Sequence, residues 1–378
     1  MELYTIAEAD ESSVSASDIL AQTLIVGAVI LTPSSFKRQR KSEQFPTKHL
    51  TEIGKGLQGV VFEHHDASLA LKKEHPANAS LPTNLQREYA AHDAVSAAFR
   101  RYRNSDLSKS RISVPRPHCI VGKQDEFWET NEAHFPSEHG TRETLVQMQR
   151  ILPLPKMTRR ALIAKFLPPC NNTNTSNSSD SRDSRDESIR KALADPYNKH
   201  CLVRTYLGRQ TGTRSCETFS LRNFPLYLQS MLDFGLDVHG LAASMGTAFA
   251  IMHWGAGVNG DDVEFVLGTE SLPTEFPRTS DLQRRAVGFY LLDFGQCDML
   301  DLKSADCRMV YQSFKGAMVT GDNQLFIPNC LNNPELFKSF KQAYIHAADE
   351  IILDIDLVDR YNIRQFMAEY EEYAEDFL

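Results

Sequence analysis

The spacing of hydrophobic positions changes along the chain and separates a strand-rich part from a helix-rich part. Residues 60–62 and 69–71 are short apolar runs, and each predicts a strand. Residues 118–122 and 144–152 predict two further strands, the second of which is ended by prolines. Between these pairs, residues 86–101 carry apolar side chains at every third or fourth position, which predicts an amphipathic helix.

Helical spacing dominates the second half of the chain. Apolar side chains at 238–252 recur with the period of an α-helix and predict a helix in the core. Asn333, Pro334 and Glu335 form a helix start, because asparagine caps a helix, proline suits its first turn and an acid favours its N-terminus. Acidic and aromatic residues at 369–376 predict a last helix.

These patterns divide the chain into three parts. We expect a partly disordered N-terminal arm at 1–47, a β-rich part at 48–155 and a helical part at 156–378. Within the last part, an aliphatic-free run of polar and charged residues predicts a disordered insert near 170–188, because such a run buries too little apolar surface to offset the entropy of ordering.

Composition narrows the possible partners. The 378 residues are 42% hydrophobic and 24% charged, as expected of a globular protein long enough for two lobes. The net charge of −8 argues against a nucleic-acid partner, because neutralising phosphates requires a basic face. The seven cysteines show no C-x-x-C spacing, so we expect free thiols in a reducing compartment, with neither a disulfide framework nor a zinc finger.

The N-terminal residues bear on location. The apolar run at 24–31 is too short to cross a bilayer, and acidic residues precede it where a secretory signal would carry positive charge. We therefore expect no membrane partner and a cytoplasmic location. A basic cluster at 37–41 leaves a nuclear location open.

Gly54, Gly56 and Gly59 form a G-x-G-x-x-G motif, which two unrelated kinds of phosphate-binding loop share. Here a strand rather than a helix comes after the third glycine, and the next strand carries Lys72. A strand-turn-strand flap with a lysine on the next strand is typical of a loop that covers nucleotide phosphates. An ordinary glycine-rich hairpin is the alternative, so the interpretation of the motif depends on the residues further along the chain.

An Asp-Phe-Gly tripeptide comes after the apolar run 289–292 and begins at Asp293. Its carboxylate is suited to binding Mg²⁺ beside phosphates. A second Asp-Phe-Gly begins at Asp233, but it precedes the long helix and therefore stands in the wrong order. We interpret the second tripeptide as a coincidence, because the order of the elements carries more weight than any tripeptide.

Taken in order, these elements resemble those of protein kinases over residues 50–345. The resemblance implies a two-lobed α+β fold with a small β-rich N-lobe and a larger helical C-lobe. A more specific resemblance is to a family of fungal proteins with a kinase-like domain of unknown function. The residues that carry it are 252–254, 262–268, 291–297 and 321–323.

The resemblance implies ATP and Mg²⁺ as cofactors and a role for individual residues. The residues expected to contact the nucleotide, or to orient those that do, are Gly54, Gly56, Gly59, Val61, Lys72, Glu88, Met148 and Gln149. Lys72 would hold phosphate oxygens, and Asp261 would position the acceptor hydroxyl. Asp293 would bind the metal, with Glu264 as the nearest substitute for a missing asparagine ligand.

Departures from the kinase pattern leave two main functions open. Asn259 and Gly260 replace the usual His-Arg pair before Asp261. Val266, or Phe265 if one residue is gapped, stands where the metal-binding asparagine belongs. No Ala-Pro-Glu comes after Asp-Phe-Gly. The first hypothesis is an atypical kinase that transfers phosphate to a small-molecule or protein hydroxyl. The alternative is a non-catalytic pseudokinase that acts as a nucleotide-dependent scaffold. A transcription-associated interaction protein is a third class, which only the basic cluster supports.

Overall fold

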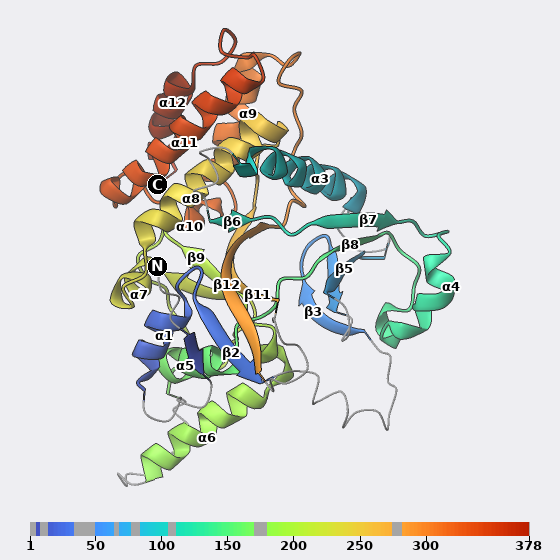
Figure 1. Ribbon diagram of the computed structural model, residues 1–378, viewed down its shortest axis with the longest axis vertical. Coiled ribbons are helices and arrows are strands. Elements are labelled where there is room, and N and C mark those ends of the chain that lie inside the picture. Colours follow the sequence, from blue (N-terminus) through green and yellow to red (C-terminus); the bar gives the residue numbers. More distant parts are fainter. Residues whose placement is uncertain are drawn as a thin grey trace.

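The fold is built on two β-sheets with helices packed around them (Figure 1). The computed structural model describes residues 5–7, 14–33, 50–63, 68–76, 84–104, 111–169, 180–273 and 282–377. The strands are β1 (Thr5–Ala7), β2 (Val29–Pro33), β3 (Thr51–Lys55), β4 (Gly59–Glu63), β5 (Leu69–Glu74), β6 (Ile112–Ser113), β7 (Pro117–Val121), β8 (Leu145–Gln149), β9 (Val203–Tyr206), β10 (Phe224–Tyr227), β11 (Glu264–Ser271) and β12 (Leu282–Leu292).

The helices fall mainly in the second half of the chain. The α-helices are α1 (Ala16–Thr23), α3 (Leu85–Arg101), α4 (Phe127–Asn131), α5 (Lys156–Phe166), α6 (Asp180–Ala194), α7 (Leu228–Asp233), α8 (Val238–Ala250), α9 (Cys307–Val319), α10 (Asn323–Phe326), α11 (Pro334–Asp354) and α12 (Ile363–Glu375). Short 3₁₀ turns are Tyr102–Asn104, Glu132–His134, Ser137–His139 and Pro196–Lys199. A π-helical turn, Ile251–Gly255, extends α8.

Within the described residues, one sheet has five strands in the order β3-β4-β5-β8-β7. The other has seven, in the order β1-β2-β12-β11-β9-β10, with β6 paired to β12. The chain therefore has a mixed α+β fold with curled sheets, and the curl is clearest in β12 at the centre of Figure 1.

The five-stranded sheet uses its two faces differently. Successive side chains of a strand point to opposite faces, so Lys72 and Lys73 of β5 face opposite ways. The Lys73 ammonium lies over the rings of Trp128 and Phe135, which pack with Phe62 in a small hydrophobic core. Lys72 faces α3 instead, which leaves its ammonium free of that core.

The expected N-terminal arm takes part in the seven-stranded sheet. Strand β2 pairs antiparallel with β12, and Ile30 is fully buried there. The expectation of a partly disordered arm at 1–47 is therefore wrong for residues 14–33, because Leu24, Ala28, Val29 and Ile30 of the apolar run are buried. The basic cluster at 37–41 lies outside the described residues.

The part expected to be helical contains most of the larger sheet. Strands β11 and β12 form a long antiparallel hairpin, in register from Glu264 with Leu292 to Ser271 with Arg285. The expectation of a helical part at 156–378 is thus corrected to a sheet covered by helices. Strand pairing explains the difference, because it satisfies the backbone groups that these apolar runs bury.

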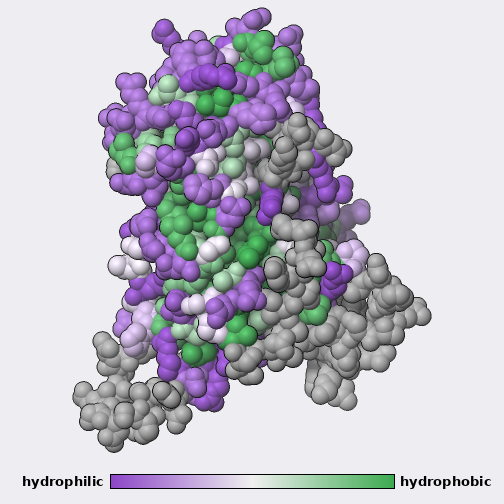
Figure 2. Space-filling model, turned by 60° about the vertical axis from the view of Figure 1, so that its left-hand side comes forward, coloured by the Kyte–Doolittle hydropathy of each residue, from purple (hydrophilic) through white to green (hydrophobic). Residues whose placement is uncertain are grey.

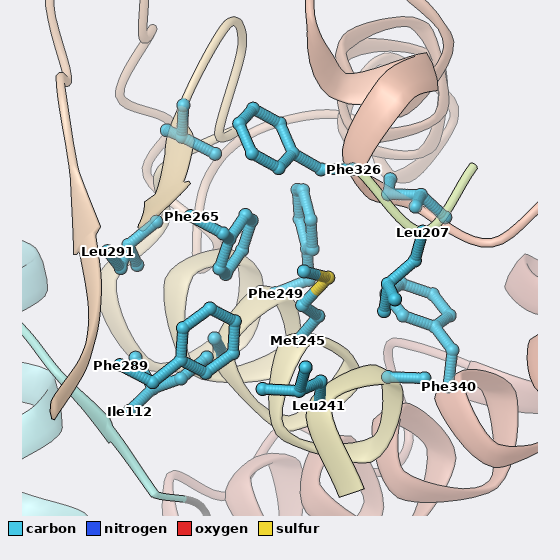
Figure 3. Close-up of a cluster of buried hydrophobic side chains, with 14 of the residues drawn as sticks. Ile112, Leu207, Leu241, Met245, Phe249, Phe265, Phe289, Leu291, Phe326 and Phe340 are labelled. Carbon is cyan, nitrogen blue, oxygen red and sulfur yellow. The ribbon is translucent and has the colours of Figure 1, made fainter. Parts of the chain in front are cut away.

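Helix α8 is the centre of the main hydrophobic core (Figure 3). Met245 and Phe249 lie four residues apart on one face of α8, as the helical period requires. Phe289 of β12 and Phe340 of α11 lie on opposite sides of them. The structure therefore confirms the core helix predicted at 238–252, which joins the sheet to α11.

The other predicted helices are present, with shifts at their ends. The amphipathic helix expected at 86–101 is α3, and the last helix, expected at 369–376, is the longer α12. The helix expected to start at Asn333 is α11, but the Asn333 side chain makes no capping hydrogen bond. Proline at the first turn remains as the local signal for that start.

Part of the expected disordered insert is helical. In α6, Arg185 donates hydrogen bonds to the carbonyls of Ala164 (3.0 Å) and Leu167 (2.7 Å) at the end of α5. These are carbonyls that a helix end leaves without partners. The expectation of disorder near 170–188 is therefore wrong from residue 180 onward, and residues 170–179 lie outside the described residues.

The described cysteines are mostly free thiols. The free ones are Cys119, Cys201, Cys297, Cys307 and Cys330. Cys216 is disulfide-bonded, so the expectation of free thiols is wrong for this residue.

Hydrophobic residues gather near the centre of the face shown in Figure 2, with hydrophilic residues above and below them. A cavity of about 400 Å³ opens between α8, α11 and residues 24–26, and its walls are mostly apolar.

None of the described helices is both long and apolar enough to cross a membrane.

The buried His253 makes the stability of this core depend on pH. Its Nδ1 lies 2.8 Å from the Tyr344 hydroxyl and its Nε2 lies 3.1 Å from the Asn259 carbonyl oxygen. Burial lowers the pKa of His253 from 6.5 to about 3, although the contact with Asn259 acts in the opposite direction. The folded protein therefore disfavours the protonated imidazole.

We expect the free energy of unfolding to be highest above pH 6.5 and to fall as the pH drops from 6.5 toward 3. His253 alone would contribute a loss of about 1.4 kcal/mol per pH unit in this window. Urea unfolding at pH 7, 6 and 5 measures the slope. His253→Gln should make the unfolding free energy depend less steeply on pH, because the variant lacks one titrating proton. An unchanged slope would show that His253 is not the titrating group.

Candidate functional site

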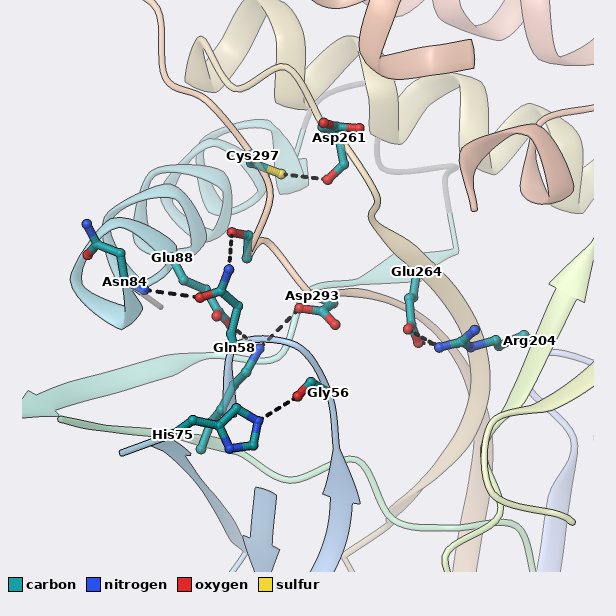
Figure 4. Close-up of polar contacts among 12 residues, drawn as sticks. Gly56, Gln58, His75, Asn84, Glu88, Arg204, Asp261, Glu264, Asp293 and Cys297 are labelled. Carbon is teal, nitrogen blue, oxygen red and sulfur yellow. Dashed lines mark hydrogen bonds and ion pairs between the residues drawn. The ribbon is translucent and has the colours of Figure 1, made fainter. Parts of the chain in front are cut away.

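The glycine-rich segment is the hairpin between β3 and β4. The Gly56 N–H donates to the Gly59 carbonyl (2.9 Å), and Nε2 of His75 lies 2.8 Å from the Gly56 carbonyl oxygen (Figure 4). At Gly59, an added Cβ would lie 2.1 Å from the Lys73 carbonyl oxygen of β5. The third glycine is therefore required by the close approach of the next strand.

Three charged side chains that the sequence assigned to the nucleotide (Lys72 and Glu88) or to its metal (Asp293) meet beside this hairpin (Figure 4). Lys72 Nζ lies 2.6 Å from Glu88 Oε1 and 3.1 Å from Asp293 Oδ1. The Lys72 and Glu88 side chains are almost fully buried, whereas the Asp293 side chain is 37% exposed. Because β5, α3 and the end of β12 supply one residue each, this cluster links the two sheets.

The Lys72 side chain in this cluster stays protonated at neutral pH. Burial alone would lower the pKa of Lys72, but the charges of Asp293 and Glu88 outweigh burial and raise it above its usual value. Burial would raise the pKa of Asp293, but Lys72, the Gly295 N–H and Arg204 together bring it below its usual value. At neutral pH the site therefore presents an ammonium group and an ionised carboxylate side by side.

A cavity of about 220 Å³ opens between the two sheets at this point. All the residues that the sequence assigned to the nucleotide line it, namely Gly54, Gly56, Gly59, Val61, Lys72, Glu88, Met148 and Gln149. The expected metal ligands Glu264 and Asp293 line it as well. The opposite wall includes Leu292 of β12, Arg204 of β9 and Leu202 just before β9. The sequence did not single out Leu202 or Arg204.

Strand β8 carries Met148 and Gln149, which the sequence assigned to the nucleotide, and the backbone donors at its end differ in whether they have a partner. The Gln149 N–H donates to the Arg116 carbonyl (2.8 Å), and the Arg150 N–H donates to the Ser68 carbonyl (2.9 Å). The Ile151 N–H makes no hydrogen bond within the described part of the chain, and Ile151 lines the cavity. Sequence reasoning missed Ile151 because strand pairing decides which donor remains free.

A second cavity, of about 210 Å³, adjoins the first and is rich in carboxylates. Lys72 and Asp293 line both cavities. Asp262, Glu264 and Asp322 also line the second one. Any phosphate group that enters from the first cavity would therefore meet an acidic surface here.

The loop after α8 presents Asp262 rather than Asp261 to the second cavity. Asp261 Oδ1 accepts a hydrogen bond from the Thr320 hydroxyl (2.7 Å), and its side chain lies apart from Asp293 in Figure 4. Asp262 has a φ of +54°, which is uncommon outside glycine. Burial, with help from the charges of Asp322 and Asp293, raises the pKa of Asp262. The structure thus does not bring the predicted Asp261 to the cavity.

A turn before α10 holds this loop in place. The Asp322 N–H donates to Asp262 Oδ1 (3.0 Å), and Asn323 Nδ2 donates to the Gly260 carbonyl (2.7 Å). Gly321 has a φ of +54°, and an added Cβ would lie 2.5 Å from Asp262 Oδ1, so only glycine fits this approach. The loop at 260–262 and the turn at 321–323 are therefore distant in the sequence but joined by hydrogen bonds in the fold.

Arg204 of β9 engages both oxygens of Glu264, the expected second metal ligand. Its guanidinium donates through Nε to Oε2 (3.2 Å) and through Nη2 to Oε1. Nη1 donates to Asp322 Oδ2 (2.8 Å) and to the Tyr206 hydroxyl (3.2 Å). Sequence reasoning missed Arg204, because no local motif marks a strand residue that enters the site through sheet pairing.

Asp293 fits a magnesium ion better than Glu264 does. Among the residues that the structure describes, no three His, Cys, Asp or Glu side chains converge as metal ligands. Mg²⁺ in nucleotide sites uses only one or two carboxylates, together with phosphates and water. The partly exposed Asp293 carboxylate meets this need, whereas Arg204 already binds both oxygens of Glu264.

The Asp-Phe-Gly segment is fixed against both α3 and the glycine-rich hairpin. The Phe294 ring stacks on His92 of α3, with centroids 4.9 Å apart. Gln58 Nε2 donates to the Gly295 carbonyl (3.1 Å), and Gln58 Oε1 accepts from the Asn84 N–H (3.1 Å). These contacts position Asp293 beneath the hairpin.

The other Asp-Phe-Gly lies elsewhere. Asp233 is exposed at the end of α7 and accepts a hydrogen bond from Gln229 Nε2 (2.9 Å). None of its three residues lines either cavity. The larger apolar cavity near α8 and α11 also contains none of the predicted site residues.

Comparisons with known proteins do not identify a family. No family model matches the chain, and no curated protein matches it. One similar solved structure is that of a microcompartment-associated aminopropanol kinase, with 11% identity over 90% of this chain and 94% of that chain. Its TM-score of 0.24 is too low to equate the two folds, so the chemistry of this site depends on its own geometry.

Proposed function

We propose that the chain binds ATP with Mg²⁺ as an atypical kinase-like protein. The observation that carries the proposal is the contact of Lys72 with Glu88 and Asp293, beside the glycine-rich hairpin and in a cavity between the sheets. A charged lysine that a carboxylate orients is suited to holding phosphate oxygens.

The positions of the side chains give each one a role in the proposal. Val61 would cover the base, and the free N–H of Ile151 would bind its edge. Lys72 would hold phosphate oxygens by its charge. Mg²⁺, when bound at Asp293, would neutralise charge on the phosphates. Asp262 would accept a hydrogen bond from the acceptor hydroxyl and take its proton, for which its raised pKa is suited.

Thermal unfolding with and without nucleotide tests the binding. A ligand present at 100 times its Kd stabilises a folded protein by about 2.7 kcal/mol, so Mg-ATP should raise the Tm by several degrees. Magnesium alone and adenosine alone serve as controls. The absence of any shift at millimolar Mg-ATP would contradict the proposal.

Substitution of the adjacent residues Asp261 and Asp262 distinguishes phosphate transfer from nucleotide binding. Asp262→Asn should slow the loss of γ-phosphate by on the order of 100-fold or more, because a general base contributes this much. Asp261→Asn is the matched control and should change the rate little, because Thr320 binds the Asp261 carboxylate. The measurement is phosphate transfer to a panel of hydroxyl compounds and proteins. A larger effect at Asp261 would reverse the assignment.

A non-catalytic, nucleotide-binding scaffold is the second candidate. The observation that favours it is that Asp261, which the resemblance assigned to the acceptor, lies outside the two cavities. This candidate predicts that Mg-ATP binds and stabilises the protein while no member of the panel receives phosphate. Detectable turnover that depends on Asp262 would exclude it.

A further inference from the structure

Strand β9 places an arginine where the two cavities meet. Arg204 lines both of them, and its side chain is only 17% exposed. In the sheet it pairs with Val266 of β11, and paired residues of antiparallel strands point to the same face. Glu264 lies two residues before Val266 on β11 and therefore on the same face of the sheet. This register places the Arg204 guanidinium beside the Glu264 carboxylate.

The guanidinium is oriented by its neighbours but not fully occupied. It has five N–H donors, of which Glu264 engages two and Tyr206 and Asp322 engage one each. One Nη2 hydrogen has no partner among the described residues. The Asp322 side chain is 36% exposed, so its carboxylate can turn to solvent when a phosphate takes its place on Nη1 of Arg204.

The charge balance of the second cavity calls for such a cation. Its lining includes four carboxylates, those of Asp262, Glu264, Asp293 and Asp322. The cations that line it are Lys72 and Arg204, and Lys72 is already paired with Glu88 as well as Asp293. Phosphates that reach this cavity would meet an excess of negative charge, and a contact with Arg204 would offset part of it.

We propose that Arg204 binds the phosphates of the nucleotide and that Glu264 orients its guanidinium rather than binding the metal. This inference rests on the proposed function and adds a phosphate-binding residue to it. A guanidinium can donate two parallel hydrogen bonds to one phosphate and stays charged at any physiological pH. Asp322 is the group that the phosphate replaces.

Isothermal titration of Arg204→Met with Mg-ATP and with adenosine tests the proposal. Methionine keeps much of the side-chain length and removes the charge. We expect Mg-ATP to bind about 10-fold to 100-fold more weakly, because hydrogen bonds to charged groups are strong. Adenosine, which has no phosphate, should bind within about twofold of the wild type. An equal loss for both ligands, or no loss for either, would overturn the proposal.

Two further variants keep the test decisive if Arg204→Met fails to fold. Asp322→Asn should tighten Mg-ATP binding by about twofold to fivefold without affecting adenosine, because the phosphate no longer competes with a carboxylate. Glu264→Gln should leave the Mg²⁺ concentration that half-saturates nucleotide binding within about twofold of the wild type. A weaker Asp322→Asn complex, or a tenfold shift of that midpoint, would contradict the assignment.

The wild-type titrations separate the proposed function from the role of Arg204. If wild-type protein binds neither Mg-ATP nor adenosine, the proposed function fails. If it binds both and the Arg204→Met variant binds Mg-ATP equally well, only the role of Arg204 fails.

Discussion

Replacing Lys72 by methionine is expected to abolish most of the affinity for Mg-ATP and to destabilise the protein. Loss of the ammonium removes the contact with phosphates, which should weaken Mg-ATP binding by about 10-fold to 100-fold. It also leaves the buried Glu88 without its cation. Removing one partner of a buried pair costs about 3–5 kcal/mol in the free energy of unfolding. Titration calorimetry and urea unfolding measure the two effects.

The loss of stability should depend on pH with a definite sign. Burial raises the pKa of Glu88, and without Lys72 no nearby cation opposes that effect. The folded variant then disfavours the ionised carboxylate, so the loss is full at neutral pH and shrinks as acid protonates Glu88. A loss of stability that grows on acidification would show that Glu88 is not the unpaired group.

Lys73→Met is the matched control, because it alters the adjacent residue on the opposite face of the same strand. Lys73 Nζ contacts the His139 carbonyl and lies over the rings of Trp128 and Phe135, away from the cavity. The control should lower the Tm but leave the Kd of the folded protein for Mg-ATP within about threefold of the wild type. Equal effects of the two substitutions on the Kd would place the nucleotide elsewhere.

Asp293→Asn is expected to remove the magnesium-dependent part of nucleotide binding. The amide can still accept a hydrogen bond from Lys72 but is a much weaker ligand for Mg²⁺. Mutation of a residue that only supports a metal ligand already weakens metal affinity about 10-fold to 100-fold. Asp293→Asn should therefore weaken nucleotide binding by at least this factor in the presence of Mg²⁺. When a chelator removes Mg²⁺ from the buffer, the variant and the wild type should bind ATP with similar affinity.

The second Asp-Phe-Gly of the chain, at Asp233, provides a control for Asp293→Asn. Asp233→Asn alters the first residue of the other Asp-Phe-Gly, which is exposed and lines neither cavity. It should change neither the affinity nor its dependence on Mg²⁺. An Asp293→Asn variant that keeps the full magnesium effect would remove Asp293 from the metal site.

The local sequence was sufficient where a side chain's role depends on its own strand or helix. Alternation along β5 puts Lys72 and Lys73 on opposite faces. The contact of Glu88 with Lys72 was expected from the resemblance to protein kinases, and the two side chains do meet. The order of these elements then indicated that Asp293 would join them, and the three side chains do meet. Periodicity is a local property, so the residues themselves reveal it.

The sequence also misplaced several segments. The polar stretch before residue 188 predicted disorder, yet Arg185 anchors part of it to α5. Residues 24–31 lacked a strong period and were assigned to an arm, yet this segment supplies β2. The second half was predicted to be helical, although β11 and β12 form its central hairpin. In each case a partner distant in the sequence supplied the missing contacts.

The sequence was therefore enough to predict that Lys72, Glu88 and Asp293 meet beside the glycine-rich hairpin. The lining of the second cavity became evident only from the folded chain. The tertiary structure turned Asp262 rather than Asp261 toward the cavity and placed Arg204 against Glu264. The physical reason is that a loop's backbone angles and the register between strands are set by contacts across the whole fold, which no local pattern of residues specifies.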